Sequence, residues 1–170
     1  MSVSPKSPPH VRAGNAMERA RAGILHAAAD LVASGGPRAV TMAAVARRAA
    51  VAKATVYNHF RDRNELLLAL LALQRENLIA HCSLAASGER LDAAAAWLSE
   101  SPVVAGVRRY EPSTLVEVAD AAASDDSVAA DVERWCATGT DPDAARRWLL
   151  SFVFAPERSG EKAPESGLAT

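Results

Sequence analysis

Apolar residues recur along the first half of the chain with the spacing of short helices that bury one face. Between Glu18 and Ser34 the apolar stripe consists of Ile24, Leu25, Ala28, Leu31 and Val32. The Gly35-Gly36-Pro37 run ends this first helix. A second set at i, i+3, i+4 and i+7 consists of Met42, Val45, Ala46 and Ala49. Val51, Val56 and Phe60 can close the angle to a third helix, so the pattern predicts three helices around one core.

A longer fourth helix is predicted from Asp62 towards Ala86. Asp62 and Glu65 form the reciprocal capping pattern. The apolar series that continues the helix is Leu66, Leu67, Leu70, Leu71, Leu73 and Leu78. The alanine-rich second half is broken at Gly88, Pro102, Pro112, Gly139 and Pro142, which predicts helices over 89–100, 103–109, 113–123, 126–137 and 142–154. The predicted fold class is all-α.

Four segments follow from this pattern. Residues 1–16, rich in proline and polar residues, are predicted to be a disordered tail, and Met17 is an alternative start. Residues 17–63 form the N-terminal helical domain. Residues 64–155 form a short helical domain, joined to the first by the long fourth helix. The polar residues 156–170 are predicted to be a second disordered tail.

The segment from Thr41 to Phe60 has the layout of a DNA-reading helix-turn-helix. It reads TMAAVARRAAVAKATVYNHF. Its apolar residues occupy one face of each helix, whereas Lys53, Thr55, Tyr57 and His59 remain on the outer face of the second. Hydroxyl, amide and cationic groups on an exposed helix are suited to phosphates and base edges.

Residues Arg21 to Leu70 resemble the N-terminal domain of the TetR family of bacterial transcriptional regulators. The matching elements are ILHAAADLVASGG, AVTMAAVARRA and VAKATVYNHFRDRNELLLAL, in that order. The resemblance covers the N-terminal part of the chain. It implies a three-helix DNA-binding domain, a fourth helix that transmits ligand binding, and a helical body that dimerises.

The resemblance also assigns DNA contacts. Lys53, Ala54 and Asn58 occupy positions that face base edges. The positions that more often contact phosphates hold Thr41, Thr55, Tyr57, His59 and Arg63. Arg47 and Arg48 are either further phosphate ligands or part of a solvated helix face, and the sequence favours neither interpretation.

Two residues depart from the family pattern in and after the turn. Ala50 stands where the family usually has Gly, at a position that commonly needs a positive φ, which costs an alanine about 1 to 2 kcal/mol. Ala52 stands where the family usually has Ser or Thr as the helix cap, and its loss costs about 1 kcal/mol. Both changes concern the stability of the domain and leave its DNA-facing side chains in place.

Charge is divided unevenly between the two halves. Residues 1–63 hold ten Lys or Arg against three Asp or Glu, a net of +7, whereas residues 64–170 hold nine against seventeen, a net of −8. A positive head on a negative body suits a DNA-binding domain fused to another domain. Chance segregation of solvated charge is the alternative. The 49% hydrophobic composition, without an apolar run of membrane-spanning length or a signal-peptide core, predicts a cytoplasmic protein that is not inserted in a membrane.

The second half offers weaker candidates. Side chains that can line an effector pocket between helices are His81, Trp97, Arg108, Tyr110 and Trp135, although core packing or solvation explains each one taken alone. Trp148, Leu149, Phe152 and Val153 form an apolar strip near the C-terminus. This strip is either a dimer interface, as the last helices are in the family, or part of the subunit's own core.

Catalytic and metal-binding patterns are missing from the sequence. It has no nucleophile elbow, phosphate loop, HExxH motif or histidine pair at ligand spacing. Cys82 and Cys136 are too widely separated for a metal motif and are interpreted as small core residues, with a redox pair as the alternative. We expect no enzymatic activity, no cofactor and no metal.

The sequence thus predicts a homodimeric regulator that binds a palindromic operator in double-stranded DNA and is released by a small-molecule effector. Most simply it is a repressor. Two alternatives remain: a DNA-binding protein whose short body lacks a ligand pocket, and a helical ligand carrier or interaction module with a vestigial helix-turn-helix.

Overall fold

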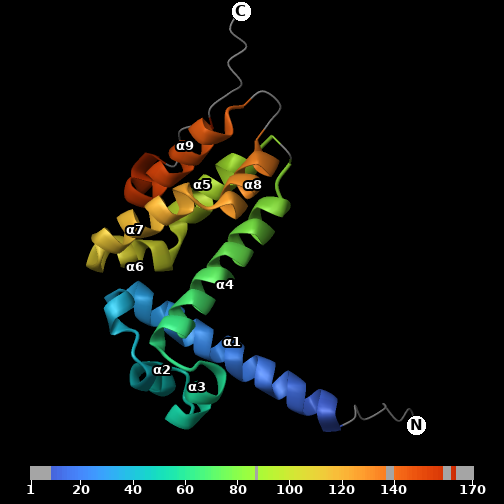
Figure 1. Ribbon diagram of the computed structural model, residues 1–170, viewed down its shortest axis with the longest axis vertical. Helices are drawn as coiled ribbons and strands as arrows, with labels where there is room; N and C mark the ends of the chain where they lie inside the picture. Colours follow the sequence, from blue (N-terminus) through green and yellow to red (C-terminus); the bar gives the residue numbers. More distant parts are fainter. Residues whose placement is uncertain (1–8, 87, 137–139, 159–161, 164–170) are drawn as a thin grey trace, which may run out of the picture.

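The computed structural model describes residues 9–86, 88–136, 140–158 and 162–163. Throughout these residues the regular structure is helical, without a strand (Figure 1), so the predicted all-α class is confirmed. The helices are α1 Pro9–Gly35, α2 Met42–Arg48, α3 Lys53–His59, α4 Arg63–Ser83, α5 Arg90–Glu100, α6 Pro102–Tyr110, α7 Pro112–Ala123, α8 Asp126–Trp135 and α9 Pro142–Phe154. Two short 3-10 turns, η1 Pro37–Ala39 and η2 Pro156–Arg158, complete the order.

Both predicted tails need correction where the structure describes them. The first helix begins at Pro9, so residues 9–16 are helical rather than disordered; residues 1–8 lie outside the described part. At the other end, Pro156–Arg158 forms η2. The backbone N–H of Ala163 donates to Asp92 Oδ1 at 2.9 Å, which fixes that residue against α5. The rest of the predicted C-terminal tail is outside the described residues.

The helices are arranged as two groups joined by α4. Helices α1 to α3, here called the head (residues 9–62), lie at one end, and α5 to α9, here called the body (residues 90–158), lie at the other (Figure 1). The head core contains the apolar stripe predicted from the sequence, including Ile24, Val45 and Phe60. The body core is built around Trp135 and Phe152.

Helix α4 belongs to both cores and begins as predicted. Asp62 Oδ1 accepts from the Glu65 N–H at 2.9 Å, and Glu65 Oε2 accepts in return from the Arg61 N–H at 2.7 Å. Near its start α4 buries Leu66 and Leu70 in the head core, and near its end it buries Cys82 in the body core. The helix ends at Ser83, three residues short of the predicted Ala86.

Head and body also touch directly where α6 crosses α1. A methyl group built on Gly106 of α6 would lie 2.2 Å from the Val32 carbonyl oxygen of α1, closer than atoms can approach. Only a residue without a side chain permits this backbone approach. The Glu111 carboxylate that follows α6 accepts from the Arg38 N–H of η1 at 2.5 Å.

Candidate DNA-binding face

The turn between α2 and α3 holds a non-glycine residue in the left-handed region. Ala50 has φ 53°, as its position in the motif predicts, and it is the one described non-glycine residue with a positive φ. The turn is closed by the Val51 N–H, which donates to the Ala46 carbonyl at 3.0 Å. The strain of about 1 to 2 kcal/mol that an alanine carries in this conformation is therefore present in the head.

The two helices of the motif are capped unequally. Thr41 Oγ1 accepts from the Ala44 N–H at 3.1 Å and caps α2. Ala52 stands at the cap of α3 in an extended conformation, without a side-chain hydrogen bond. The first amides of α3 are consequently left for solvent or another acceptor. The hydroxyl of Thr41, assigned to phosphate by resemblance, is already used within the head.

Helix α3 turns one face into the core and the other outward. Val56 and Phe60 are buried against α1 and α2. Lys53, Ala54 and Asn58 are exposed on the opposite side. The residues of α3 expected to face base edges therefore share an accessible surface, which is the geometry that reading a groove requires.

The α3 residues expected to contact phosphates lie beside that surface and differ in how far they are exposed. Tyr57 is 47% exposed, while Thr55 and His59 are half-buried. Lys53 Nζ lies 5.7 Å from the centre of the Tyr57 ring, a cation–π distance that draws both side chains to one place. Tyr57 thus orients the Lys53 ammonium group, and its own hydroxyl is available to contact a phosphate.

A hollow of about 420 Å³ adjoins the end of α3. Its lining residues are Tyr57, Asn58, His59, Phe60, Arg61 and Glu65. Arg61, absent from the residues predicted to bind DNA, adds an exposed guanidinium whose Nε lies 3.8 Å from Glu65 Oε2. The signal that would have found it is a basic residue directly before the α4 cap, on the same surface as Tyr57 and His59.

Two arginines that were candidates for phosphate contact bind other residues of the head. Arg63 donates from Nη2 to the Pro37 carbonyl at 2.7 Å and from Nε to the Val40 carbonyl at 2.8 Å, so it ties α4 to the loop before α2. Its assignment to phosphate is therefore corrected to a structural one. Arg48 Nε donates to Asp30 Oδ2 at 3.0 Å, which favours the surface-pairing interpretation. Arg47 remains exposed.

This arrangement defines the class of protein, a helix-turn-helix DNA-binding protein with an exposed basic helix. A family model described as "Bacterial regulatory proteins, tetR family" matches residues 24–70, which span most of α1, the motif and the start of α4. Residues 24–70 are therefore similar to the DNA-binding domain of the TetR family, and the protein is a DNA-binding transcriptional regulator. No curated protein matches the chain.

The body residues predicted to line an effector pocket do not come together. Trp135 is buried in the body core, Trp97 is half-buried on α5, and His81 and Tyr110 are exposed at the ends of α4 and α6. Arg108 Nε donates to the Val153 carbonyl at 2.8 Å, which fixes α6 to α9. The cleft between α1 and α4 and the hollow at the end of α3 are lined by other residues. An effector pocket in the body stays a prediction, and the described positions of these five side chains are spread over four helices.

The C-terminal apolar strip is largely internal. Leu149 and Phe152 are buried within the subunit, and the Trp148 ring packs edge-on against Phe152 with centroids 4.8 Å apart. Trp148 and Val153 are half-buried. The alternative that this strip packs inside its own subunit is correct for Leu149 and Phe152, because α9 turns this face towards α5 and α8.

The cysteines and metal ligands show no reactive arrangement in the part of the chain that the structure describes. Cys82 is buried in the body core as interpreted, and burial raises the pKa of its thiol to about 11, so the thiolate is disfavoured. Burial also raises the pKa of Cys136, which is half-buried.

No described cluster of His, Cys, Asp or Glu could hold a metal ion. No described helix is long and apolar enough to cross a membrane.

Proposed function

We propose that this regulator is a cytoplasmic homodimeric repressor that covers a palindromic operator and leaves it when a small molecule binds. The observation that carries the proposal is the exposed face of α3, where Lys53, Ala54 and Asn58 are presented together on a helix anchored by Val56 and Phe60. Short polar and basic side chains on such a helix reach base edges in the major groove.

The dimer is inferred from the size of the reading surface. Helix α3 has seven residues, too few for one head to contact more than a few base pairs. Two heads related by a two-fold axis bind half-sites about 34 Å apart and double the contact area. An operator with inverted repeats is the expected consequence, since its symmetry mirrors that of the protein.

A second candidate is a DNA-binding regulator that lacks a ligand pocket in its body. It is favoured by the filling of the body core, where Trp135 and Phe152 occupy the space between helices. Such a protein stays on DNA until a partner or its own concentration removes it. The helical carrier with a vestigial motif is the third candidate, and it is distinguished by its failure to bind DNA.

The proposal is tested by selecting DNA from a random pool with the full chain at two salt concentrations. The Lys53→Ala, Tyr57→Ala double variant is run in parallel, and Arg109→Ala, an exposed arginine of α6, serves as the matched control. Wild type and control should enrich one palindrome, which the double variant should lose. Addition of salt should weaken the binding, because cations are released from neutralised phosphates.

Each outcome separates the candidates. Enrichment of a sequence without inverted repeats would contradict the two-fold arrangement while keeping the regulator. Failure of the wild type to enrich any sequence would remove the repressor and favour the carrier.

A further inference from the structure

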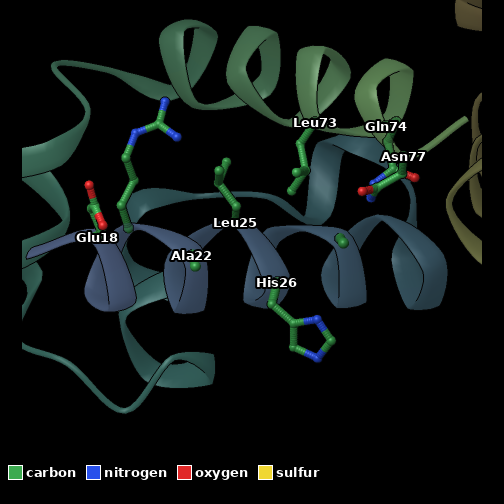
Figure 2. Close-up of a pocket in the computed structure, with 9 residues that line it drawn as sticks. Glu18, Ala22, Leu25, His26, Leu73, Gln74 and Asn77 are labelled. Atoms are coloured by element: carbon green, nitrogen blue, oxygen red, sulfur yellow. The ribbon is translucent and has the colours of Figure 1, made fainter. Parts of the chain in front are cut away.

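A cleft of about 540 Å³ runs between α1 and α4, outside the body. Ala22, Leu25 and Ala29 form its wall on α1, and Leu73 stands on the α4 side. Leu25 and Leu73 point towards each other across the gap (Figure 2). Small-molecule sites commonly measure roughly 300 to 1,000 Å³ and have mainly apolar walls. This cleft has a volume in that range and a mainly apolar lining, and it is open to solvent on one side.

Polar groups are confined to the ends of the cleft. Gln74 and Asn77 of α4 lie together at one end (Figure 2), and within the described residues neither carboxamide has a protein hydrogen-bond partner. Glu18 and Arg21 lie at the other end. The Arg21 guanidinium lies 5.0 Å above the centre of the Phe60 ring, which holds it at the edge of the head core.

The charges around the cleft cancel. Glu18 and Arg21 contribute one negative and one positive charge at the same end, and the His26 ring points away from α4 (Figure 2). An ionised ligand would lose hydration in the apolar channel without a net opposite charge to replace it. A neutral ligand loses little, and the free carboxamides of Gln74 and Asn77 offer it both donors and acceptors.

The cleft adjoins the middle of α4 at the edge of the head core, to which Leu25 belongs and against which Leu73 packs. Before it, Leu66 and Leu70 are buried in the head core, and beyond it Cys82 is buried in the body core. Arg75, on another face of the same turn, donates from Nε to Asp131 Oδ2 of α8 at 3.1 Å. Asp131 is only 4% exposed, so α4 is tied to the body on the side away from the cleft.

We propose that this cleft binds an uncharged, elongated, amphipathic small molecule, with its hydrogen-bonding end at Gln74 and Asn77 and its apolar end between Leu25 and Leu73. The proposal rests on the proposed function, because it assigns the effector a site where the head meets α4. A ligand here separates α1 from α4 directly. It shifts the head only to the extent that it binds one α1–α4 spacing better than another.

The test uses the uncharged fluorescent probe phenylnaphthylamine, titrated against the full chain. Ala22→Trp fills the cleft from α1, where Ala22 is solvent-exposed and a larger side chain leaves the core intact. Ala72→Trp, at an exposed α4 position outside the cleft lining, is the matched control. Wild type and Ala72→Trp should bind the probe saturably, and Ala22→Trp should bind it at least about tenfold more weakly.

A second variant keeps the test valid if Ala22→Trp does not fold. The Gln74→Glu, Asn77→Asp double variant keeps the shape of the cleft and places two negative charges at its polar end, so it should also weaken binding of the uncharged, apolar probe. Helical circular dichroism confirms that each variant is folded. Equal probe affinity in wild type and in both cleft variants, or no saturable binding to the wild type, would overturn the proposed site.

Selection of DNA with the same proteins separates the two proposals. If the wild type enriches a palindrome but binds no probe in the cleft, the cleft proposal fails and the repressor stands. If the probe binds and the cleft variants lose it, but no DNA is enriched, the site stands and the proposed function fails. Where both hold, the probe should change the affinity of the wild type for the selected DNA and leave that of Ala22→Trp unchanged.

Discussion

Neighbouring residues of α3 perform opposite tasks because one helical step rotates the side chain by about 100°. Val56 is fully buried in the head core, whereas Tyr57 is 47% exposed and contacts Lys53. Val56 determines how α3 packs in the head, and Tyr57 determines what the exposed face of α3 can bind. A substitution at Val56 is therefore expected to act through stability, and one at Tyr57 through binding.

Ala50 offers a residue where stability can be changed without touching the reading surface. Ala50→Gly should raise the free energy of unfolding by about 1 kcal/mol, since glycine relieves the left-handed strain at φ 53° and offsets part of that gain through its greater freedom when unfolded. Urea unfolding measures the change.

Ala49→Gly is the matched control. Ala49 has φ −79° and ψ −4°, a conformation that alanine adopts without strain. The same change there should lower stability by about 0.5 to 1 kcal/mol. If both variants shift in the same direction, the strain assigned to Ala50 is wrong.

At the scale of elements, the contact between α6 and α1 determines how head and body are joined. Gly106 lets the two backbones meet at Val32, and Arg108 on the same helix binds the Val153 carbonyl of α9. Helix α6 is therefore held by the head on one side and the body on the other. Motion of the body relative to α4 must be accommodated at this crossing.

Gly106→Ala should lower the free energy of unfolding by about 2 to 3 kcal/mol, because the new methyl group would lie 2.2 Å from the Val32 carbonyl oxygen and must push the helices apart. Gly23→Ala is the comparison, since a methyl group there meets nothing within 4 Å. That change should stabilise the helix by about 0.5 to 1 kcal/mol. Thermal unfolding of the two variants checks both signs, and a neutral Gly106→Ala would show that the crossing yields easily.

At the scale of the whole molecule, the charge division orients the protein on DNA. Residues 1–63 carry a net of +7 and residues 64–170 a net of −8, so the head is drawn to phosphates while the body is repelled. Pairing within the head moderates this attraction. Arg48 is bound to Asp30, and Arg61 lies beside Glu65.

Arg47→Ala should weaken binding to all DNA sequences alike and reduce the slope of log affinity against log salt by about one. Its exposed guanidinium has the character of a phosphate contact that reads no base. Lys53→Ala should instead change which sequence is preferred, because Lys53 stands on the base-facing surface of α3. Titrations at several salt concentrations separate the two, and an unchanged slope in Arg47→Ala would place that side chain off the DNA.

Features that depend on neighbouring residues could be predicted from the sequence. The apolar spacing predicted the buried face of each head helix, and the Asp62 and Glu65 pair predicted the start of α4. The resemblance to the TetR family added the strained turn at Ala50 and the uncapped helix after Ala52. Each of these depends on residues no more than a few positions apart. Local geometry and hydrogen bonding decide such features before any long-range contact forms.

Contacts between distant segments were decided only by the tertiary structure. Arg63 was predicted at phosphate and instead binds the Pro37 and Val40 carbonyls. Leu149 and Phe152 were assigned either to a dimer interface or to the subunit's own core, and the folded chain buries both in that core. An apolar or cationic side chain has the same sequence signature whether its partner is solvent, DNA, another subunit or a helix elsewhere in the chain. Its partner is determined by which surfaces the folded helices bring within reach, and a one-dimensional pattern does not contain that information.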